Sequence, residues 1–319
     1  MTPTHDTAPA EAPVARGYDE ELYFLAFDHR GVFARSVLDV DVPSPEDEGT
    51  IADCKAVILE GLQRAIALGG VPRERLGVLV DELYGAQVAR DAKAAGAVVT
   101  MPVEEPDQDV FRPAYGAAFG DHIEAFDPDF AKVLVRFNAD GPADDNRVQL
   151  ERLRELSDWL TAHGRRFLFE LITPPTADQL AAVDGDVERF ERELRPALIR
   201  RAMAAVQDAG VEVDVWKLEG LDDPADARAT VEQARNAPHR AGVACIVLGA
   251  GASQERVDHW LRVAAATDGF VGFAIGRSIW RAPLRAMLSG ENDRAEAAER
   301  IARGYLRFVD VYRGGADVA

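Results

Sequence analysis

One lysine stands in a strand-like apolar segment, VDVWKLEG, at residues 213–220. In a strand, Lys217 shares its side with Val215 and Glu219, because successive side chains alternate between the two faces. Burial disfavours the charged form of a lysine, and the neutral amine is the form that attacks a carbonyl carbon to make a Schiff base. The segment therefore indicates imine chemistry at Lys217. The competing interpretation is a structural contact between Lys217 and Glu219, or a lysine whose tip reaches solvent.

A carboxylate lies in a second apolar segment, RFLFELI, at residues 166–172. If the aromatic side of this strand faces covering helices, Glu170 points into the interior together with Lys217. A buried carboxyl group there could have a raised pKa and carry protons in a reaction. A buried salt bridge from Glu170 to Arg136, Lys132 or Lys217 is the alternative.

A third segment, KVLVRF at residues 132–137, places Lys132 and Arg136 on one side of a strand. A second ammonium group near Lys217 would lower the pKa of Lys217 by repulsion between like charges. Ordinary ion pairing of Lys132 inside the core explains the pattern equally well.

The elements that position these residues alternate regularly. Strand-like segments occupy residues 23–28, 76–81, 97–101, 132–137, 166–172, 213–218, 243–248 and 270–275. Helix-like segments, with apolar residues three or four apart, occupy residues 50–68, 85–95, 146–163, 187–210, 225–236, 254–265 and 291–313. The connection between residues 101 and 132 is the least regular, and we expect a loop with a short helix there.

Eight strands alternating with helices over about 300 residues predict an α/β protein with a single (β/α)8 TIM barrel. We expect the barrel over residues 19–319 and a disordered tail over residues 1–18, which are rich in Pro, Ala and Thr. An open doubly wound sheet is the alternative. Such a sheet usually has a glycine-rich turn after its first strand, and AFDHRG is not one.

Catalytic groups in such barrels come from the carboxyl ends of the strands, and here these ends are polar. The first strand is followed by Asp28, His29 and Arg30. The last two strands end in the glycine loops LGAGAS and IGRSIW, whose backbone N–H groups and following helices suit a phosphate. These loops predict a phosphate site made of Gly249, Gly251, Gly276, Arg277 and Ser278.

Composition excludes several classes of function. The chain has 319 residues and a net charge of −19, which argues against binding to nucleic acid or anionic membranes. Two cysteines, no long apolar run and no signal pattern predict a soluble cytoplasmic protein. The six histidines lack metal-ligand spacing, so we expect no metal and no cofactor. Mg²⁺ held by Asp28, Asp81, Glu82 or Glu170 is the alternative.

The motifs AFDHRG, VDELYG, KVLVRFN, FLFELI, DVWKLEG, LGAGAS and AIGRSIW together resemble those of class I aldolases related to tagatose-1,6-bisphosphate aldolase. The phrases AFDHR, MPVE, HIEAFDP, KVLVR, FLFEL and DVWKLEG are more similar to the aldolase module of bacterial inositol catabolism, which is often fused behind a 5-dehydro-2-deoxygluconokinase. The resemblance spans roughly residues 22–285 and all eight predicted strands.

This resemblance implies a metal-free Schiff-base aldolase with a (β/α)8 fold. Lys217 matches the imine-forming lysine, Glu170 the proton-transfer residue, Lys132 the second lysine and Asp28 a residue that contacts substrate hydroxyl groups. The glycine loops and Arg277 fall where the family binds phosphate. Two positions depart from the tagatose type. His29 replaces a glutamine and Arg136 an aromatic residue, which is consistent with an acidic substrate tail.

We therefore predict cleavage of a phosphorylated keto-sugar or keto-sugar acid, best matched by 2-deoxy-5-keto-gluconate 6-phosphate. His29, Arg30, Arg136 and Glu219 are expected to contact the substrate. A tagatose-bisphosphate aldolase, a sulfosugar-phosphate aldolase and a transaldolase remain alternatives within this chemistry. A non-catalytic sugar-phosphate-binding protein is the alternative of another class. The only partner predicted is the small phosphorylated sugar, and formation of a homo-oligomer is left open.

Overall fold

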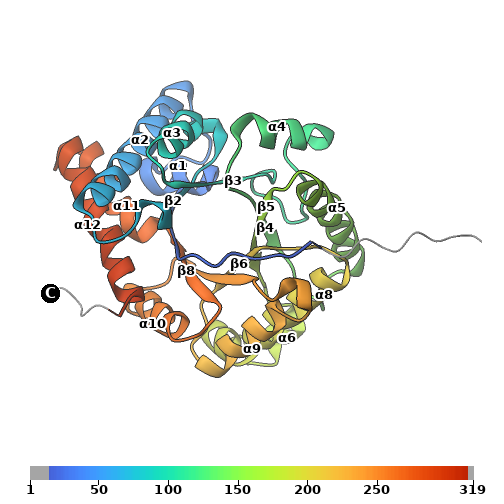
Figure 1. The fold of residues 1–319 in the computed structure, drawn as a ribbon. Coiled ribbons are helices and arrows are strands. Elements are labelled where there is room, and N and C mark those ends of the chain that lie inside the picture. Colours follow the sequence, from blue (N-terminus) through green and yellow to red (C-terminus); the bar gives the residue numbers. More distant parts are fainter. Residues whose placement is uncertain (1–13, 315–319) are drawn as a thin grey trace, which may run out of the picture.

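The computed structural model describes residues 14–314 and shows eight parallel strands closed into a barrel, surrounded by helices (Figure 1). The strands follow one another around the ring in chain order. They are β1 (Leu22–Ala26), β2 (Leu76–Leu79), β3 (Val98–Pro102), β4 (Phe130–Arg136), β5 (Arg166–Ile172), β6 (Val215–Glu219), β7 (Ala244–Leu248) and β8 (Phe270–Ile275). The closed ring confirms the predicted (β/α)8 barrel and excludes an open doubly wound sheet.

The helices lie outside the strands and cover them (Figure 1). They are α1 (Arg30–Leu38), α2 (Pro45–Leu68), α3 (Glu82–Ala94), α4 (Phe119–Phe126), α5 (Ala143–Ala162), α6 (Ala177–Ala181), α7 (Val187–Arg189), α8 (Arg195–Asp208), α9 (Pro224–Ala234), α10 (Gln254–Ala265), α11 (Arg277–Leu288) and α12 (Arg294–Tyr312). Short turns of 3-10 helix occur at η1 (Arg73–Arg75), η2 (Gly116–Ala118) and η4 (Pro238–Arg240). Among the described residues, no helix combines the length and the apolarity needed to cross a membrane.

One predicted helix is divided in the structure. Residues 187–210 form α7, a π-helical segment η3 (Phe190–Leu194) and α8 rather than one continuous α-helix. Pro196 lies in the first turn of α8. Proline has no N–H to donate to a carbonyl of the preceding turn, so the regular hydrogen-bond pattern is interrupted at this point.

Side chains alternate between the two faces of each strand, and the two faces contribute to two separate hydrophobic clusters. Leu168 and Val215 belong to the cluster that fills the barrel interior. Phe167 and Phe169 belong to the larger cluster between the strands and the helices. The aromatic side of β5 therefore faces the helices, which is the arrangement needed for Glu170 to point inward.

The segment before β1 crosses the barrel at the amino-terminal ends of the strands (Figure 1). Arg16 N donates a hydrogen bond to His239 O over 2.7 Å, and Gly17 forms a bridge with Gly242. The ring of Tyr18 packs edge-on against Phe130, with centroids 5.3 Å apart. Residues 1–13 of the predicted tail lie outside the described residues. Residues 16–18 pack against the amino-terminal end of the barrel, so the prediction of a disordered tail is wrong for them.

The last helix, α12, packs against α2 and the barrel. Tyr305 donates a hydrogen bond from its hydroxyl to Tyr23 O at β1, and Tyr312 donates one to Phe270 O at β8 over 2.8 Å. Ile301 and Phe308 are buried on the same helix. Residues 294–312 therefore belong to the fold of the barrel.

Candidate active site

The register of β5 and β6 brings the predicted lysine and glutamate together. Glu170 and Lys217 are direct partners in the two parallel strands. Lys217 Nζ lies 2.8 Å from Glu170 Oε1, and the two residues are only 2% and 3% exposed. Lys217 thus contacts Glu170 rather than Glu219, so the structural contact considered as an alternative is not formed.

Lys132, on β4, lies at the centre of the buried charges. Its Nζ is 2.9 Å from Asp28 Oδ2, 2.8 Å from Glu104 Oε1 and 2.9 Å from Glu170 Oε2. Lys132 is 1% exposed. Two lysines and three carboxylates therefore form one buried network, in which Glu170 joins Lys132 to Lys217.

The pKa of Glu170 is lower than the sequence predicted. Burial by itself would raise the pKa, but the ammonium groups of Lys132 and Lys217 outweigh burial and lower the pKa of Glu170 to about 2. The expectation of a raised pKa is therefore wrong for the free protein. Glu170 is a carboxylate there and carries no proton to donate.

The other charges of the network follow from the same contacts. Burial alone would lower the pKa of Lys132, but Asp28, Glu104 and Glu170 raise that pKa well above its usual value. Burial would raise the pKa of Asp28, but Lys132, with smaller effects of His29 and Lys217, holds it well below its usual range. Lys132 is therefore a permanent ammonium group beside Glu170.

Glu104 and His29 complete this side of the network. Burial raises the pKa of Glu104 despite its contact with Lys132. His29 Nε2 lies 3.6 Å from Asp28 Oδ1. The Asp28 carboxylate raises the pKa of His29, but burial and the two lysines lower it, and the net pKa is below the usual value. Glu104 was missed as a site residue, although it stands at the end of the MPVE phrase, two residues after the last residue of β3.

Both glycine loops open into the cavity that contains Lys217 and Glu170. This cavity has a volume of about 300 Å³. Its lining includes His29, Arg136, Glu170, Lys217, Gly249, Gly251, Gly276, Arg277, Ser278 and Trp280. The predicted imine-forming amine and the predicted phosphate loops thus share one space.

Glycine is required in both loops. Gly251 has φ +76°, and a Cβ atom there would lie 2.8 Å from Arg277 Nη2. A Cβ atom at Gly276 would lie 2.0 Å from Ala26 O. The guanidinium group of Arg277, at the start of α11, therefore lies against the first loop, and the two loops form a single cationic edge of the cavity.

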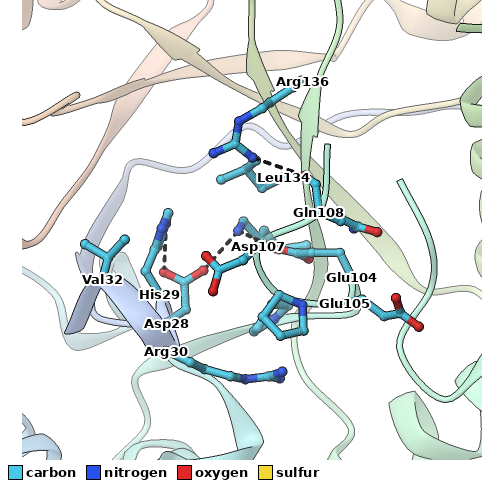
Figure 2. Close-up of a pocket in the computed structure, with 13 residues that line it drawn as sticks. Asp28, His29, Arg30, Val32, Glu104, Glu105, Asp107, Gln108, Leu134 and Arg136 are labelled. Atoms are coloured by element: carbon cyan, nitrogen blue, oxygen red, sulfur yellow. Dashed lines mark hydrogen bonds and ion pairs between the residues drawn. The ribbon is translucent and has the colours of Figure 1, made fainter. Parts of the chain in front are cut away.

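A smaller cavity of about 80 Å³ is lined by residues that include Asp28, Glu104 and Lys132. In Figure 2, Arg136 lies above Asp28 and Glu104, and it is the last residue of β4. The lining residues shared by the two cavities are His29, Val32, Leu134 and Arg136. The two cavities are therefore neighbours, and Arg136 lies between them.

Two predicted site residues are engaged elsewhere. Glu219 Oε1 lies 3.2 Å from Arg195 Nη1, and its Oε2 accepts a hydrogen bond from Thr173 N over 3.0 Å. Glu219 lines neither cavity, because the buried Arg195 of α8 holds it at the side of the barrel. Arg30 lines the smaller cavity, but it pairs with Glu82 over 2.6 Å and with Asp81 over 3.6 Å. Its charge is therefore largely compensated within the protein.

A buried lysine that the sequence did not single out supports the end of β1. Lys55, on α2, is 0% exposed, pairs with Asp81 and donates a hydrogen bond to Phe27 O over 2.9 Å. Phe27 directly precedes Asp28. Lys55 thereby fixes the backbone that carries Asp28 into the site.

The structure also contains a set of potential metal ligands. Asp28, His29 and Glu170 place one ligand atom each within 4.8 Å of one another. Both carboxylates already contact lysine ammonium groups at 2.8–2.9 Å. A cation at this position would compete with Lys132 and Lys217 for the same oxygens. The donor set admits a metal only if the lysines move or lose their charge.

Solved structures share this fold. The chain is similar to Cgl0159 from Corynebacterium glutamicum, with 18% identity, a TM-score of 0.55 and coverage of 92% of this chain and 88% of that one. It is similar to an archaeal fructose 1,6-bisphosphate aldolase with 13% identity, a TM-score of 0.58 and coverage of 92% and 94%. A Schiff-base-forming fructose-1,6-bisphosphate aldolase matches with 13% identity, a TM-score of 0.53 and coverage of 89% and 93%. The chain thus has the same fold as these three structures.

Comparison at the level of sequence gives the family. No curated protein matches the chain. One family model, described as "Uncharacterized protein conserved in bacteria (DUF2090)", matches residues 10–315. The chain belongs to the DUF2090 family.

Proposed function

We propose that the protein is a class I aldolase that cleaves a phosphorylated keto-sugar through a Schiff base on Lys217. The observation that carries this proposal is the pairing of buried Lys217 with Glu170 in the cavity that also contains the glycine loops and Arg277. An aldolase of this class needs an amine, a neighbouring proton acceptor and an anchor for the phosphate. The similarity of the barrel to aldolase structures agrees with the proposal.

The choice of Lys217 over Lys132 as the nucleophile follows from their contacts. Three carboxylates stabilise the ammonium form of Lys132, whereas Lys217 has only Glu170 among the described residues. Glu170 can accept the proton that Lys217 must lose. When that proton leaves, one of the two charges that lower the pKa of Glu170 disappears, so Glu170 becomes able to hold it.

The proposed reaction runs through an enamine. The Lys217 amine attacks the ketone carbon to give a carbinolamine. Glu170 passes the proton that it took from Lys217 to the carbinolamine hydroxyl, and loss of water gives a protonated imine and a Glu170 carboxylate. The bond between the α- and β-carbons then breaks, its electron pair moves toward the imine to form the enamine, and the proton of the β-hydroxyl passes to Glu170. The aldehyde product leaves. Glu170 returns the proton to the α-carbon, and water hydrolyses the imine to release the ketone product and free Lys217.

The glycine loops and Arg277 set the register of the substrate. Backbone N–H groups and a guanidinium group are suited to a phosphate, and a fixed phosphate places the ketone at Lys217. For 2-deoxy-5-keto-gluconate 6-phosphate, the products are dihydroxyacetone phosphate and malonate semialdehyde. This substrate is the specific form of the proposal.

A coupled assay tests the proposal. The protein is incubated with 2-deoxy-5-keto-gluconate 6-phosphate, and dihydroxyacetone phosphate is detected through NADH oxidation by glycerol-3-phosphate dehydrogenase. We expect activity that withstands chelators and is lost in Lys217→Arg, which keeps a positive charge beside Glu170. The control Lys93→Arg changes an exposed lysine on α3 that pairs with Asp127. We expect this control to remain active.

Other results separate the alternatives. If the protein cleaves only tagatose bisphosphate or a sulfosugar phosphate, the proposed Schiff-base mechanism stands and the proposed substrate is wrong. Activity that is lost on chelation and restored by a divalent cation would favour a metal-dependent lyase built on Asp28, His29 and Glu170. Full activity of Lys217→Arg would refute the proposed nucleophile.

A further inference from the structure

Arg136 presents an uncompensated positive charge where the two cavities meet. It is the last residue of β4, its side chain is exposed, and it lines both cavities. Its Nη1 donates a hydrogen bond to Gln108 O over 3.3 Å, and no described carboxylate forms an ion pair with it. In a chain of net charge −19, a guanidinium group without an acidic partner is available to an anionic ligand.

Gln108 adds a buried donor beside this charge (Figure 2). Its side-chain Oε1 accepts a hydrogen bond from Arg112 N, which fixes which end of the amide is the oxygen. The remaining Nε2 is buried and has no hydrogen-bond partner within residues 14–314. Gln108 is 8% exposed and lines the smaller cavity. A buried donor without an acceptor is costly, so Nε2 is available to an acceptor on a ligand in the cavity.

The order of the strands places these donors opposite the phosphate loops. β4 and β8 are four strands apart in a closed ring of eight, so Arg136 and Arg277 lie on opposite sides of the barrel mouth. Lys217, on β6, lies midway between them around the ring. A substrate held by its phosphate at Arg277, with its ketone at Lys217, therefore extends its far end toward Arg136.

From these observations we infer that Arg136 and Gln108 form a subsite for a carboxylate at the end of the substrate remote from the phosphate. The planar guanidinium group matches the two oxygens of a carboxylate, and the Gln108 amide supplies a further donor. This inference rests on the proposed function and narrows its substrates to keto-sugar acids, whose aldehyde product carries the carboxylate.

Neighbouring acids limit where this carboxylate lies. Asp28 and Glu104 already contact Lys132, which leaves that ammonium group compensated. Glu105 pairs with Arg112 over 2.7 Å, whereas Asp107 remains as a negative charge on the cavity lining. The carboxylate therefore lies near Arg136, at the outer side of the smaller cavity, and away from Lys132.

The first test compares two aldehydes in the direction of synthesis with dihydroxyacetone phosphate. Malonate semialdehyde carries the carboxylate, and propanal is a neutral aldehyde of the same chain length. Because hydrogen bonds to charged groups are worth enough to change affinity strongly, we expect Arg136→Gln to lower the ratio of kcat/KM for malonate semialdehyde to that for propanal by about 10- to 100-fold. Arg136→Lys should retain part of the ratio that Arg136→Gln loses, because lysine keeps the positive charge but cannot form the two parallel hydrogen bonds of a guanidinium group.

Two further variants make the comparison sharper. Gln108→Glu keeps the size and the acceptor for Arg112 N but replaces the free donor by an acidic oxygen, so the ratio should fall as in Arg136→Gln. Arg147→Gln removes a positive charge from the exposed face of α5, where Arg147 pairs with Glu151 and both residues lie outside the two cavities; it should leave the ratio unchanged. An equal fall in Arg147→Gln would show a general effect of charge and would overturn the subsite.

A binding measurement keeps the subsite testable if the aldolase proposal fails. Failure of the wild type to consume either aldehyde would refute the proposed substrates. In that event NMR titration with propionate, in excess inorganic phosphate to occupy the glycine loops, still tests the subsite. We expect both Arg136→Gln and Gln108→Glu to bind propionate at least about 10-fold more weakly than wild type. Equal binding by all three proteins would refute the inference.

Discussion

Replacement of Lys132 by methionine should destabilise the protein more than the same replacement of Lys217. Lys132 compensates three buried carboxylates, whereas Lys217 contacts only Glu170, which also has Lys132 as a partner. Lys132→Met leaves Asp28 and Glu104 without any ammonium group within 4 Å among the described residues. Lys217→Met leaves every carboxylate of the network with one.

The size of the difference follows from these contacts. At 2.9 Å and an effective dielectric constant of about 20, two unit charges attract by about 6 kcal/mol before the cost of desolvation is counted. Removal of one partner from a buried ion pair costs about 3–5 kcal/mol in net stability. Loss of one charged hydrogen bond, as in Lys217→Met, costs about 1.5–3 kcal/mol. Since whole domains are stable by about 5–15 kcal/mol, Lys132→Met brings the protein close to unfolding.

Urea unfolding at pH 7, followed by circular dichroism, measures both variants. A double variant, Lys132→Met with Glu104→Gln, removes one of the unpaired negative charges, and we expect it to recover about 1–3 kcal/mol of the loss. This variant also provides folded protein if Lys132→Met alone does not fold. Equal stability of Lys132→Met and Lys217→Met, or no recovery in the double variant, would refute the description of Lys132 as the centre of the charge network.

Three further predictions concern individual contacts. The pKa of Glu170 is lowered from 4.5 to about 2, so the stabilisation by this carboxylate is present above pH 4.5 and is lost as the pH falls toward 2. The difference in unfolding free energy between wild type and Glu170→Gln should therefore shrink over that range. A difference that stays constant would contradict the lowered pKa. Glu219→Gln should lower the free energy of unfolding by about 1–3 kcal/mol, because the ion pair with Arg195 is lost, and should leave aldol cleavage intact. A loss of cleavage with unchanged stability would show that Glu219 acts in the active site. Arg277→Gln should raise KM for the phosphorylated substrate by about 10- to 100-fold with a smaller change in kcat, whereas an unchanged KM would place the phosphate elsewhere.

Alternation along the strands made the central pair of the site predictable. Glu170 and Lys217 each interrupt an apolar strand, and a period of two determines which side chains face the interior. Their contact then requires only that β5 and β6 be neighbours in register, which a barrel with strands in chain order provides. The pKa of Glu170 was mispredicted because it depends on two lysines at contact distance, and sequence does not give such distances.

Residues outside the regular strands were harder to predict. Glu104 follows β3 in an irregular connection, where no periodicity indicates the direction of a side chain. Lys55 lies on a long amphipathic helix, where a lysine is ordinarily at the surface, and its burial depends on Asp81 from another element. The strand pattern places Glu219 on the same side as Lys217, but the Glu219 carboxylate forms an ion pair with Arg195 of α8. In each case the partner comes from a distant part of the chain.

Borohydride trapping tests the central proposal most directly. The protein is incubated with dihydroxyacetone phosphate and sodium borohydride, digested, and mapped by mass spectrometry, with Lys217→Arg treated in parallel. We expect a reduced adduct on the peptide that contains Lys217 and none on the peptide that contains Lys132, which its three carboxylates keep charged. Absence of an adduct while dihydroxyacetone phosphate still binds, or an adduct on Lys132 instead, would contradict Schiff-base catalysis at Lys217.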